Sequence, residues 1–155
     1  MSIVGTIKVN MKPVNAVLHS KGLTVDGDVQ RFHTANVLRR IVKYMPYRTG
    51  ATIKLTQAQS PIDRPEINLF APYARYLHEG RAMVDAATGK GPSFIPGVGP
   101  RWPRGSKLTA TDRPLTYTRT KNPNAGPYWG RRLMAAEGDA MRADLKNYVQ
   151  RRDGR

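Results

Sequence analysis

The clearest hydrophobic pattern along the chain predicts an amphipathic helix that begins near residue 28 and ends before Pro46. Apolar side chains recur there every three or four residues, at Val29, Phe32, Ala35, Leu38, Ile41 or Val42, and Met45. Asp26 and Asp28 are candidates for its N-cap, and Pro46 cannot continue a helix. The opposite face is basic and carries Arg31, Arg39, Arg40 and Lys43. Most of these cations lie near the helix C-terminus, where the helix dipole favours positive charge.

A second long helix is expected near the C-terminus, from about residue 127 to residue 151. One of its faces is apolar and carries Trp129, Leu133, Ala136, Ala140, Leu145, Tyr148 and Val149. Pro127 suits the first turn of a helix, because that position needs no backbone N–H. Between the two long helices, residues 73–77 predict a short helix, with Gly80 as its C-terminal cap.

Several segments have the pattern of β-strands. Residues 3–11 and 51–57 alternate in polarity with a period of two. Residues 67–69 suggest a strand antiparallel to 51–57, and residues 115–119 suggest a further strand. Because no regular crossover helices separate these strands, the expected fold class is α+β. We expect a small antiparallel sheet covered by the two main helices, within a single domain of residues 1–155.

Residues 81–114 differ in character from the rest of the chain. They contain five Pro and five Gly, a density that removes backbone donors and interrupts regular periodicity. We therefore expect a long extended loop. Loops of this length within a compact domain usually either have a function or are disordered, so we expect this segment to extend from the body and be held by partners.

Charge and cysteine content narrow the function classes. The chain has 26 Lys and Arg against 11 Asp and Glu, a net charge of +15, which attracts polyanions. Residues 81–132 hold ten Lys or Arg against two Asp, so this third of the chain carries +8. The charge could meet DNA, or it could meet acidic neighbouring proteins. The absence of Cys excludes disulfides, thiolate metal sites and cysteine nucleophiles. No signal peptide and no apolar run long enough for a membrane span is expected, so we expect a soluble protein without membrane contact.

Candidate catalytic and metal-binding motifs are all incomplete. His19, His33 and His78 are scattered, and Ala82 stands where a helical zinc site that includes His78 would need its second His. Residues 88–93 lack the leading Gly and the following helix of a phosphate-binding loop. Asp26 and Asp28 lack the further oxygen ligands of a calcium loop. We expect no catalytic residue, no metal and no cofactor, and therefore no enzyme.

The sequence Arg101-Trp102-Pro103-Arg104 interleaves cations with an aromatic ring. This combination occurs in proteins that bind single-stranded nucleic acid, where bases stack on the ring. It is also typical of interface hot spots, since Trp and Arg are enriched there. The sequence leaves both readings open.

Three motifs in order carry information about a family. The first is Pro46-Tyr47-Arg48-Thr49-Gly50 at the end of the first helix, and the second runs from Ala71 to Gly80. The third comprises Leu115-Thr116-Tyr117, then Asn122-Pro123-Asn124-Ala125-Gly126 and Trp129. Over roughly residues 30–150, this order resembles the minor capsid protein family of long-tailed bacteriophages, which is related to phage neck and tail completion proteins. The positions that match the family motif are Pro46, Thr49, Gly50, Tyr73, Ala74, Glu79, Gly80, Asn122, Pro123, Ala125, Gly126 and Trp129.

The resemblance implies a structural protein of the virion neck, which joins head to tail and completes the tail as a ring around the DNA channel. It implies six-fold symmetry, a portal-side connector or head-closure protein as one partner, and a tail terminator or tail tube protein as the other. The protein would then be found in the virion at the neck, and in the host cytoplasm during assembly. Residues that we expect at subunit interfaces are Arg75, Glu79, Phe94, Ile95, Trp102 and Leu108. Residues that we expect to face DNA are Arg101, Arg104 and Lys107. The alternative function is a free-standing, non-specific nucleic-acid-binding protein, which the charge supports but no recognition helix or aromatic sheet motif does.

Overall fold

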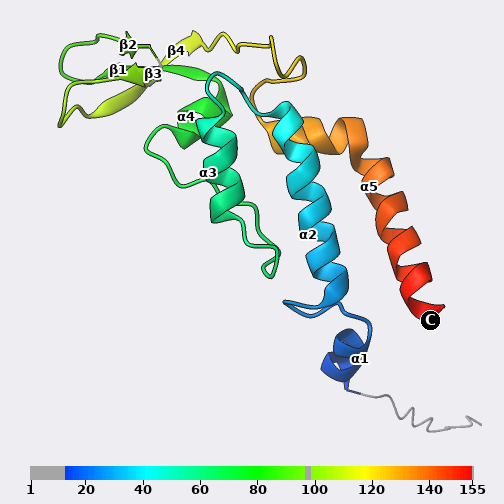
Figure 1. The fold of residues 1–155 in the computed structure, drawn as a ribbon. Helices are drawn as coiled ribbons and strands as arrows, with labels where there is room; N and C mark the ends of the chain where they lie inside the picture. Colours follow the sequence, from blue (N-terminus) through cyan, green and yellow to red (C-terminus); the bar gives the residue numbers. More distant parts are fainter. Residues whose placement is uncertain (1–12, 97–98, 155) are drawn as a thin grey trace, which may run out of the picture.

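The protein is an elongated assembly of helices with a β-structured projection at one end, as a computed structural model shows (Figure 1). The structure describes residues 13–96 and 99–154. Its helices are α1 (Val14–Ser20), α2 (Asp28–Ile41), the 3-10 helix η1 (Val42–Tyr44), α3 (Ala51–Gln59), α4 (Ala74–Glu79) and α5 (Trp129–Asp153). Its strands are β1 (Arg81–Asp85), β2 (Ser93–Ile95), β3 (Gly99–Arg101) and β4 (Leu108–Pro114). The α+β class with a small antiparallel sheet is thus confirmed. The strand predicted at residues 3–11 lies outside the described residues.

The two long helices, both expected from the sequence, pack side by side and form the core of the body (Figure 1). The core cluster consists of Ile41, Tyr44, Met45, Trp129, Leu133 and Met141. Burial of these apolar side chains is the main favourable contribution to the stability of the body. The N-cap of α2 is Gly27 and not a carboxylate, since no side chain caps this helix. Asp28 lies in the first turn, where its negative charge suits the helix dipole.

The prediction of a strand at residues 51–57 is wrong, because these residues belong to α3. Ile53, Thr56 and Ser60 are spaced as one helical face, and this face is turned inward although two of its members are polar. Thr56 can be buried at 1% exposure because its hydroxyl donates to the carbonyl of Thr52 at 2.9 Å within the same helix. The sequence does not show this hydrogen bond, so the alternation of polar and apolar residues suggested a strand.

The partner strand predicted at residues 67–69 is also wrong. This segment is extended, but its backbone bonds to side chains at the end of α3 and not to another strand. The backbone N–H of Asn68 donates to the Ser60 hydroxyl at 2.8 Å, and that of Phe70 donates to Gln59 Oε1 at 2.6 Å. Side chains of α3 therefore take the place that a neighbouring strand would have.

Residues 81–114, named the arm below, form two nested antiparallel ladders and not the expected irregular loop. β1 pairs with β4, with Asp85 opposite Leu108, and β2 pairs with β3, with Phe94 opposite Pro100. Pro is tolerated here because each strand of a two-stranded sheet is an edge strand. The last expected strand, 115–119, is wrong, because the strand ends at Pro114 and the following residues are irregular.

The arm projects from the body at the end opposite α1 (Figure 1). It packs on the body mainly through α4, which contacts β1, whereas α2 and α5 pack mainly on each other. The short helix α4 and its cap were both expected from the sequence, and Gly80 adopts the left-handed conformation at φ 77°. No helix in the described part of the chain combines the length and apolar character needed to cross a membrane.

Candidate functional site

The first motif, Pro46 to Gly50, forms the turn that leads from the core helix into α3. Met45 is extended at φ −85° and ψ 148°, so the chain leaves the helical conformation at the residue before Pro46. Gly50 has φ 78° and serves as the N-cap of α3. This left-handed conformation favours glycine, since it costs residues with a Cβ atom about 1 to 2 kcal/mol.

The second motif ends at Gly80, where the end of α4, the segment after the arm and the segment before α5 meet. Its carbonyl accepts the N–H of Leu115 at 2.8 Å, and its own N–H donates to Tyr76 at 2.9 Å. A Cβ atom at this position would lie 2.9 Å from Cβ of Pro127 and 3.2 Å from the Tyr117 hydroxyl. Glycine is therefore required at this position by its backbone conformation and by the close approach of its neighbours.

The third motif caps the C-terminal end of the core helix. The side-chain amide of Asn122 donates to the carbonyls of Val42 at 2.8 Å and Met45 at 2.9 Å. The Val42 carbonyl also accepts the Met45 N–H at 3.4 Å, so Asn122 adds a second donor there and caps the Met45 carbonyl just beyond the last helical turn. Ala125 is fully buried, and the Trp129 ring belongs to the core and contacts the edge of His78 at 4.6 Å between centroids. The turn expected at residues 122–126 is confirmed, and its motif residues build the fold.

Where the arm meets the body, the first motif and the arm enclose a cavity of about 410 Å³, named the arm-base cavity below. Its lining comes from the 46–50 turn, the start of α3, α4, the arm and the segment after the arm. The lining residues are Pro46, Tyr47, Arg48, Thr49, Gly50, Ala51, Thr52, Tyr73, Leu77, Ala82, Met83, Pro92, Pro100, Arg101, Trp102, Arg113, Leu115, Thr116, Tyr117 and Thr118. Motif residues that are far apart in the sequence thus share one concave surface with the arm.

The charge in this lining is positive. Arg48, Arg101 and Arg113 contribute to it, and none of its residues is acidic. Within the described residues none of these three arginines forms an ion pair with a carboxylate. The Arg48 guanidinium lies over the ring of Phe94 at 3.7 Å from its centroid, a cation–π contact that joins the turn to the arm.

Of two aromatic side chains in the lining, Tyr117 has a hydrogen-bond partner for its polar group and Trp102 has none among the described residues. The Tyr117 hydroxyl donates to the carbonyl of Leu77 at 2.5 Å, and burial raises the pKa of this hydroxyl to about 12. It therefore stays protonated and fixed at neutral pH. The indole Nε1 of Trp102 is buried, yet it finds no acceptor among the described residues. A buried donor without a partner costs about 1 to 3 kcal/mol.

The residues expected at interfaces have different environments. Phe94 and Ile95 are exposed by 52% and 45% in the arm. Arg75 and Glu79 form an exposed pair one helical turn apart at 2.9 Å, and the Arg75 guanidinium lowers the pKa of the Glu79 carboxyl. Leu108 lies within the β1–β4 ladder, where its carbonyl accepts the Tyr76 hydroxyl at 3.0 Å.

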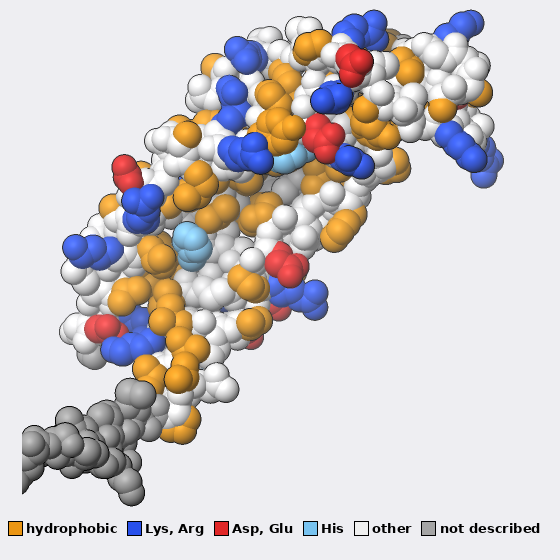
Figure 2. Space-filling view, turned by 180° about the vertical axis from the view of Figure 1, so that it is seen from behind, with side chains coloured by type: hydrophobic (Ala, Val, Ile, Leu, Met, Phe, Trp, Pro, Cys, Tyr) orange, Lys and Arg blue, Asp and Glu red, His pale blue; other side chains and the backbone are white. Residues whose placement is uncertain are grey.

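The residues expected to face DNA are all exposed, with Arg101 in β3 and Arg104 and Lys107 between β3 and β4. On the face that Figure 2 shows, basic side chains are spread over the arm end and the middle of the molecule, with apolar side chains between them. They do not gather into one continuous basic band on that face.

The incomplete phosphate-binding and metal-binding motifs of the sequence contribute to turns and packing. Residues 86–90 form the turn after β1, which Asp85 holds by accepting the N–H groups of Ala87 at 2.7 Å and Thr88 at 3.1 Å. The Ser106 hydroxyl and these N–H groups lower the pKa of the Asp85 carboxyl. Burial lowers the pKa of His78. The described residues contain no group of three or more His, Cys, Asp or Glu side chains that could hold a metal ion.

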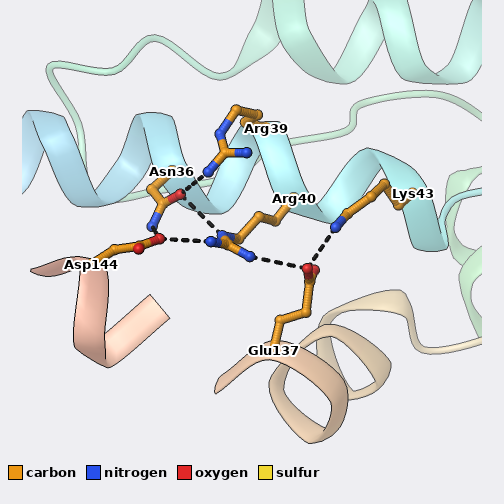
Figure 3. A network of polar contacts seen from close by, with 6 residues as sticks. All are labelled: Asn36, Arg39, Arg40, Lys43, Glu137 and Asp144. Atoms are coloured by element: carbon orange, nitrogen blue, oxygen red, sulfur yellow. Dashed lines mark hydrogen bonds and ion pairs between the residues drawn. The ribbon is translucent and has the colours of Figure 1, made fainter. Parts of the chain in front are cut away.

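A network of charged side chains joins α2 to α5 (Figure 3). Arg40 bonds to Glu137 at 3.0 Å and to Asp144 at 2.6 Å, and Lys43 bonds to Glu137 at 2.5 Å. Asn36 donates to Asp144 at 2.9 Å and lowers the pKa of that carboxyl together with Arg40. The basic face of α2, which the sequence placed opposite the core, therefore contacts the other long helix in part.

Sequence reasoning missed Tyr47, Arg48, Arg113 and Tyr117 as site residues, although the quoted motifs contain three of them. Their membership of the family motifs was the available signal, but nothing in the sequence indicated that these motifs share one cavity. Comparison with known protein families, curated proteins and solved structures gives no match to this chain.

Proposed function

We propose that this protein is a structural component of the neck of a long-tailed phage virion. It takes part in head–tail connection and tail completion as one subunit of a ring around the DNA channel, with six-fold symmetry. A portal-side connector or head-closure protein lies on one side of the ring, and a tail terminator or tail tube protein on the other. The protein is found at the neck of the virion and, during assembly, in the host cytoplasm.

The arm is the observation that carries this proposal. It projects beyond the helical body and exposes Phe94 and Ile95, although nothing in the arm's own ladders needs an exposed aromatic ring. Aromatic side chains on a projection suit contact with a neighbouring subunit, since burying them there supplies binding energy. The resemblance of the three motifs to phage neck proteins supports the same function.

The chemistry of the arm-base cavity also favours binding over catalysis. Its described lining offers guanidinium groups, aromatic rings, prolines and threonine hydroxyls. No carboxylate or imidazole in that lining is placed to act as a general base. Such a surface is suited to recognising a partner.

Quantitative mass spectrometry of purified particles tests the proposal. The phage that encodes this chain should contain it at a low copy number that fits one ring, because closed rings have few subunits. Absence from the particles, or the hundreds of copies typical of a shell protein, would overturn the proposal.

The net charge of +15 favours a second candidate, non-specific binding of nucleic acid. Binding to duplex DNA should then weaken steeply as salt rises, because neutralised phosphates release counterions. Fluorescence anisotropy with two unrelated duplexes over a salt series measures this dependence. A strong sequence preference that survives high salt would point to a regulator, whereas a lack of binding at low salt would assign the charge to acidic protein partners.

A further inference from the structure

The arm-base cavity has no acidic side chain to balance its three arginines. Arg48 comes from the first motif, Arg101 from β3 and Arg113 from β4, so two parts of the chain direct positive charge to one concave site. A lining with only positive charge attracts an oppositely charged ligand. The cavity is thus complementary to a negatively charged group.

The remainder of the lining is largely apolar or aromatic. Tyr73, Leu77, Met83 and Leu115 contribute to it, and the Tyr117 ring is held in place by its hydrogen bond to the Leu77 carbonyl. A concave apolar surface with few polar groups is typical of a pocket that receives a side chain or small ligand. The volume of about 410 Å³ is enough for a few side chains.

Trp102 adds an aromatic ring to this lining. Its indole Nε1 is buried and lacks an acceptor among the described residues, so an oxygen of a ligand could bond to it only if the Trp102 ring turned toward the cavity. Arginine and tryptophan together with an apolar surface are also the residue types that dominate hot spots between proteins.

We propose that the arm-base cavity binds an acidic segment of a neighbouring virion protein, one that inserts an apolar side chain flanked by carboxylates. This inference rests on the proposed function only in assigning the partner to the virion. A protein segment suits the site better than duplex DNA, because a rigid duplex cannot enter a cavity of this size and DNA-binding surfaces are more polar.

Two tryptophans in the chain, Trp102 and Trp129, make a direct test possible. The full chain is labelled with 5-fluorotryptophan and observed by fluorine NMR, with Trp102→Phe used to assign the resonances. The probes are synthetic decapeptides with one central Leu, Phe or Trp among Glu residues, and matched peptides with Gln or Lys in place of Glu. The acidic peptides should shift the Trp102 resonance in a saturable way, while Trp129 in the core should not respond.

Matched arginine variants separate this site from general attraction to a basic protein. The double substitution Arg48→Gln and Arg101→Gln should weaken binding at least about tenfold, because it removes two charges from the lining. Arg104→Gln removes a charge from the same arm but outside the lining. The affinity of this variant for the acidic peptide should stay within about twofold of that of the unchanged protein.

Several results would overturn the proposal. They are a Trp102 resonance unmoved by every acidic peptide, an equal response to the Lys peptides, or an equal loss of affinity with Arg104→Gln. A larger shift with single-stranded DNA than with any peptide would make the cavity a nucleic-acid site. These failures are distinct from failure of the proposed function, which the composition of the virion decides. Saturable peptide binding by a chain absent from virions would refute only the virion partner.

Discussion

At the scale of single residues, Asn122 joins the third motif to the end of the first core helix, far away in the sequence. Its side-chain amide holds the last carbonyls of the core helix segment, at Val42 and Met45. Removing it leaves two acceptors without this donor in a partly buried place, and we expect Asn122→Ala to lower the free energy of unfolding by about 1 to 3 kcal/mol. Urea denaturation measures this change.

Asn124 gives a matched control for this prediction. It belongs to the same turn, its side chain is exposed, and only its backbone carbonyl takes part in a hydrogen bond, with Arg132. Asn124→Ala should therefore change the free energy of unfolding by less than about 0.5 kcal/mol. Equal losses for the two variants would show that Asn122 matters as a turn residue and not as a cap.

Gly80 and Gly89 allow two effects of glycine to be measured separately. Both have positive φ, 77° and 66°, but a Cβ atom at Gly80 would meet Pro127 at 2.9 Å, whereas one at Gly89 would meet nothing within 4 Å. Gly89→Ala should lower the free energy of unfolding by about 1 to 2 kcal/mol, the cost of the left-handed conformation alone. Gly80→Ala should cost about 1 to 3 kcal/mol more, because its neighbours must shift. Chemical denaturation of both variants checks the order, which an equal loss would contradict.

The structural role of a residue can be predicted from the sequence when that residue acts on its own backbone, but not when it acts on a distant segment. Pro46 and Gly80 act on their own backbone, so their roles as helix stop and cap follow from residue type alone. The cap by Asn122 acts on residues about 80 positions away in the sequence. No local pattern reveals such a contact.

At the scale of elements, the pair α2 and α5 should be sensitive to acid. The pKa of Glu137 is lowered, first by the hydrogen bond from Lys43, and that of Asp144 is lowered, first by Asn36 and then by Arg40. Carboxyls with a lowered pKa in the folded state stabilise it above their ordinary pKa values of 4.5 and 3.8. That stability is lost as the pH falls through the lower pKa values of the folded state.

The melting temperature should therefore be nearly constant from neutral pH to about pH 5 and should decrease at lower pH. Arg40→Gln should lower the melting temperature at pH 7 and flatten its fall in acid, because both carboxyls lose a charged partner that they share. Arg142→Gln, which removes only an exposed pair with Asp139 within α5, should leave both unchanged. Calorimetry over a pH series measures this, and an unaltered acid profile in Arg40→Gln would contradict it.

Element prediction succeeded for the long helices and failed for every strand that falls within the described residues. The helices α2 and α5 contact each other through polar as well as apolar side chains, but both are long and keep enough apolar positions at helical spacing for their period to be visible in the sequence. The buried positions Thr56 in α3 and Ser60 at its C-cap are polar, so the sequence lacks the contrast between apolar and polar residues that defines a helical face. In the arm, the strands are short and mostly exposed, so no buried face imposes alternation on them.

At the scale of the whole molecule, the arm should serve assembly and contribute little to the stability of the body. Phe94→Ser removes an exposed ring and one cation–π contact with Arg48, worth about 0.5 to 1 kcal/mol at an exposed site. The melting temperature of the subunit should barely change. Complementation of a phage that lacks the gene should instead yield few joined particles, as counted by electron microscopy.

The same residue type elsewhere on the surface provides the control. Phe70 is exposed by 72% in the segment before α4 and lies outside the arm. Phe70→Ser should therefore leave head–tail joining intact. If Phe94→Ser joins particles normally, or if it unfolds the isolated subunit, the arm does not have the role assigned to it.

The chain enters and leaves the arm at neighbouring points of the body, because Arg81 pairs with Pro114 and the Leu115 N–H bonds to the Gly80 carbonyl. Segments whose two ends are adjacent tolerate insertion, deletion and exchange better than segments that bridge distant parts of a fold. A longer or shorter arm can therefore be joined to the same helical body without moving α2 and α5. On the proposed function, exchange of this one segment would adapt the same body to different neighbouring proteins.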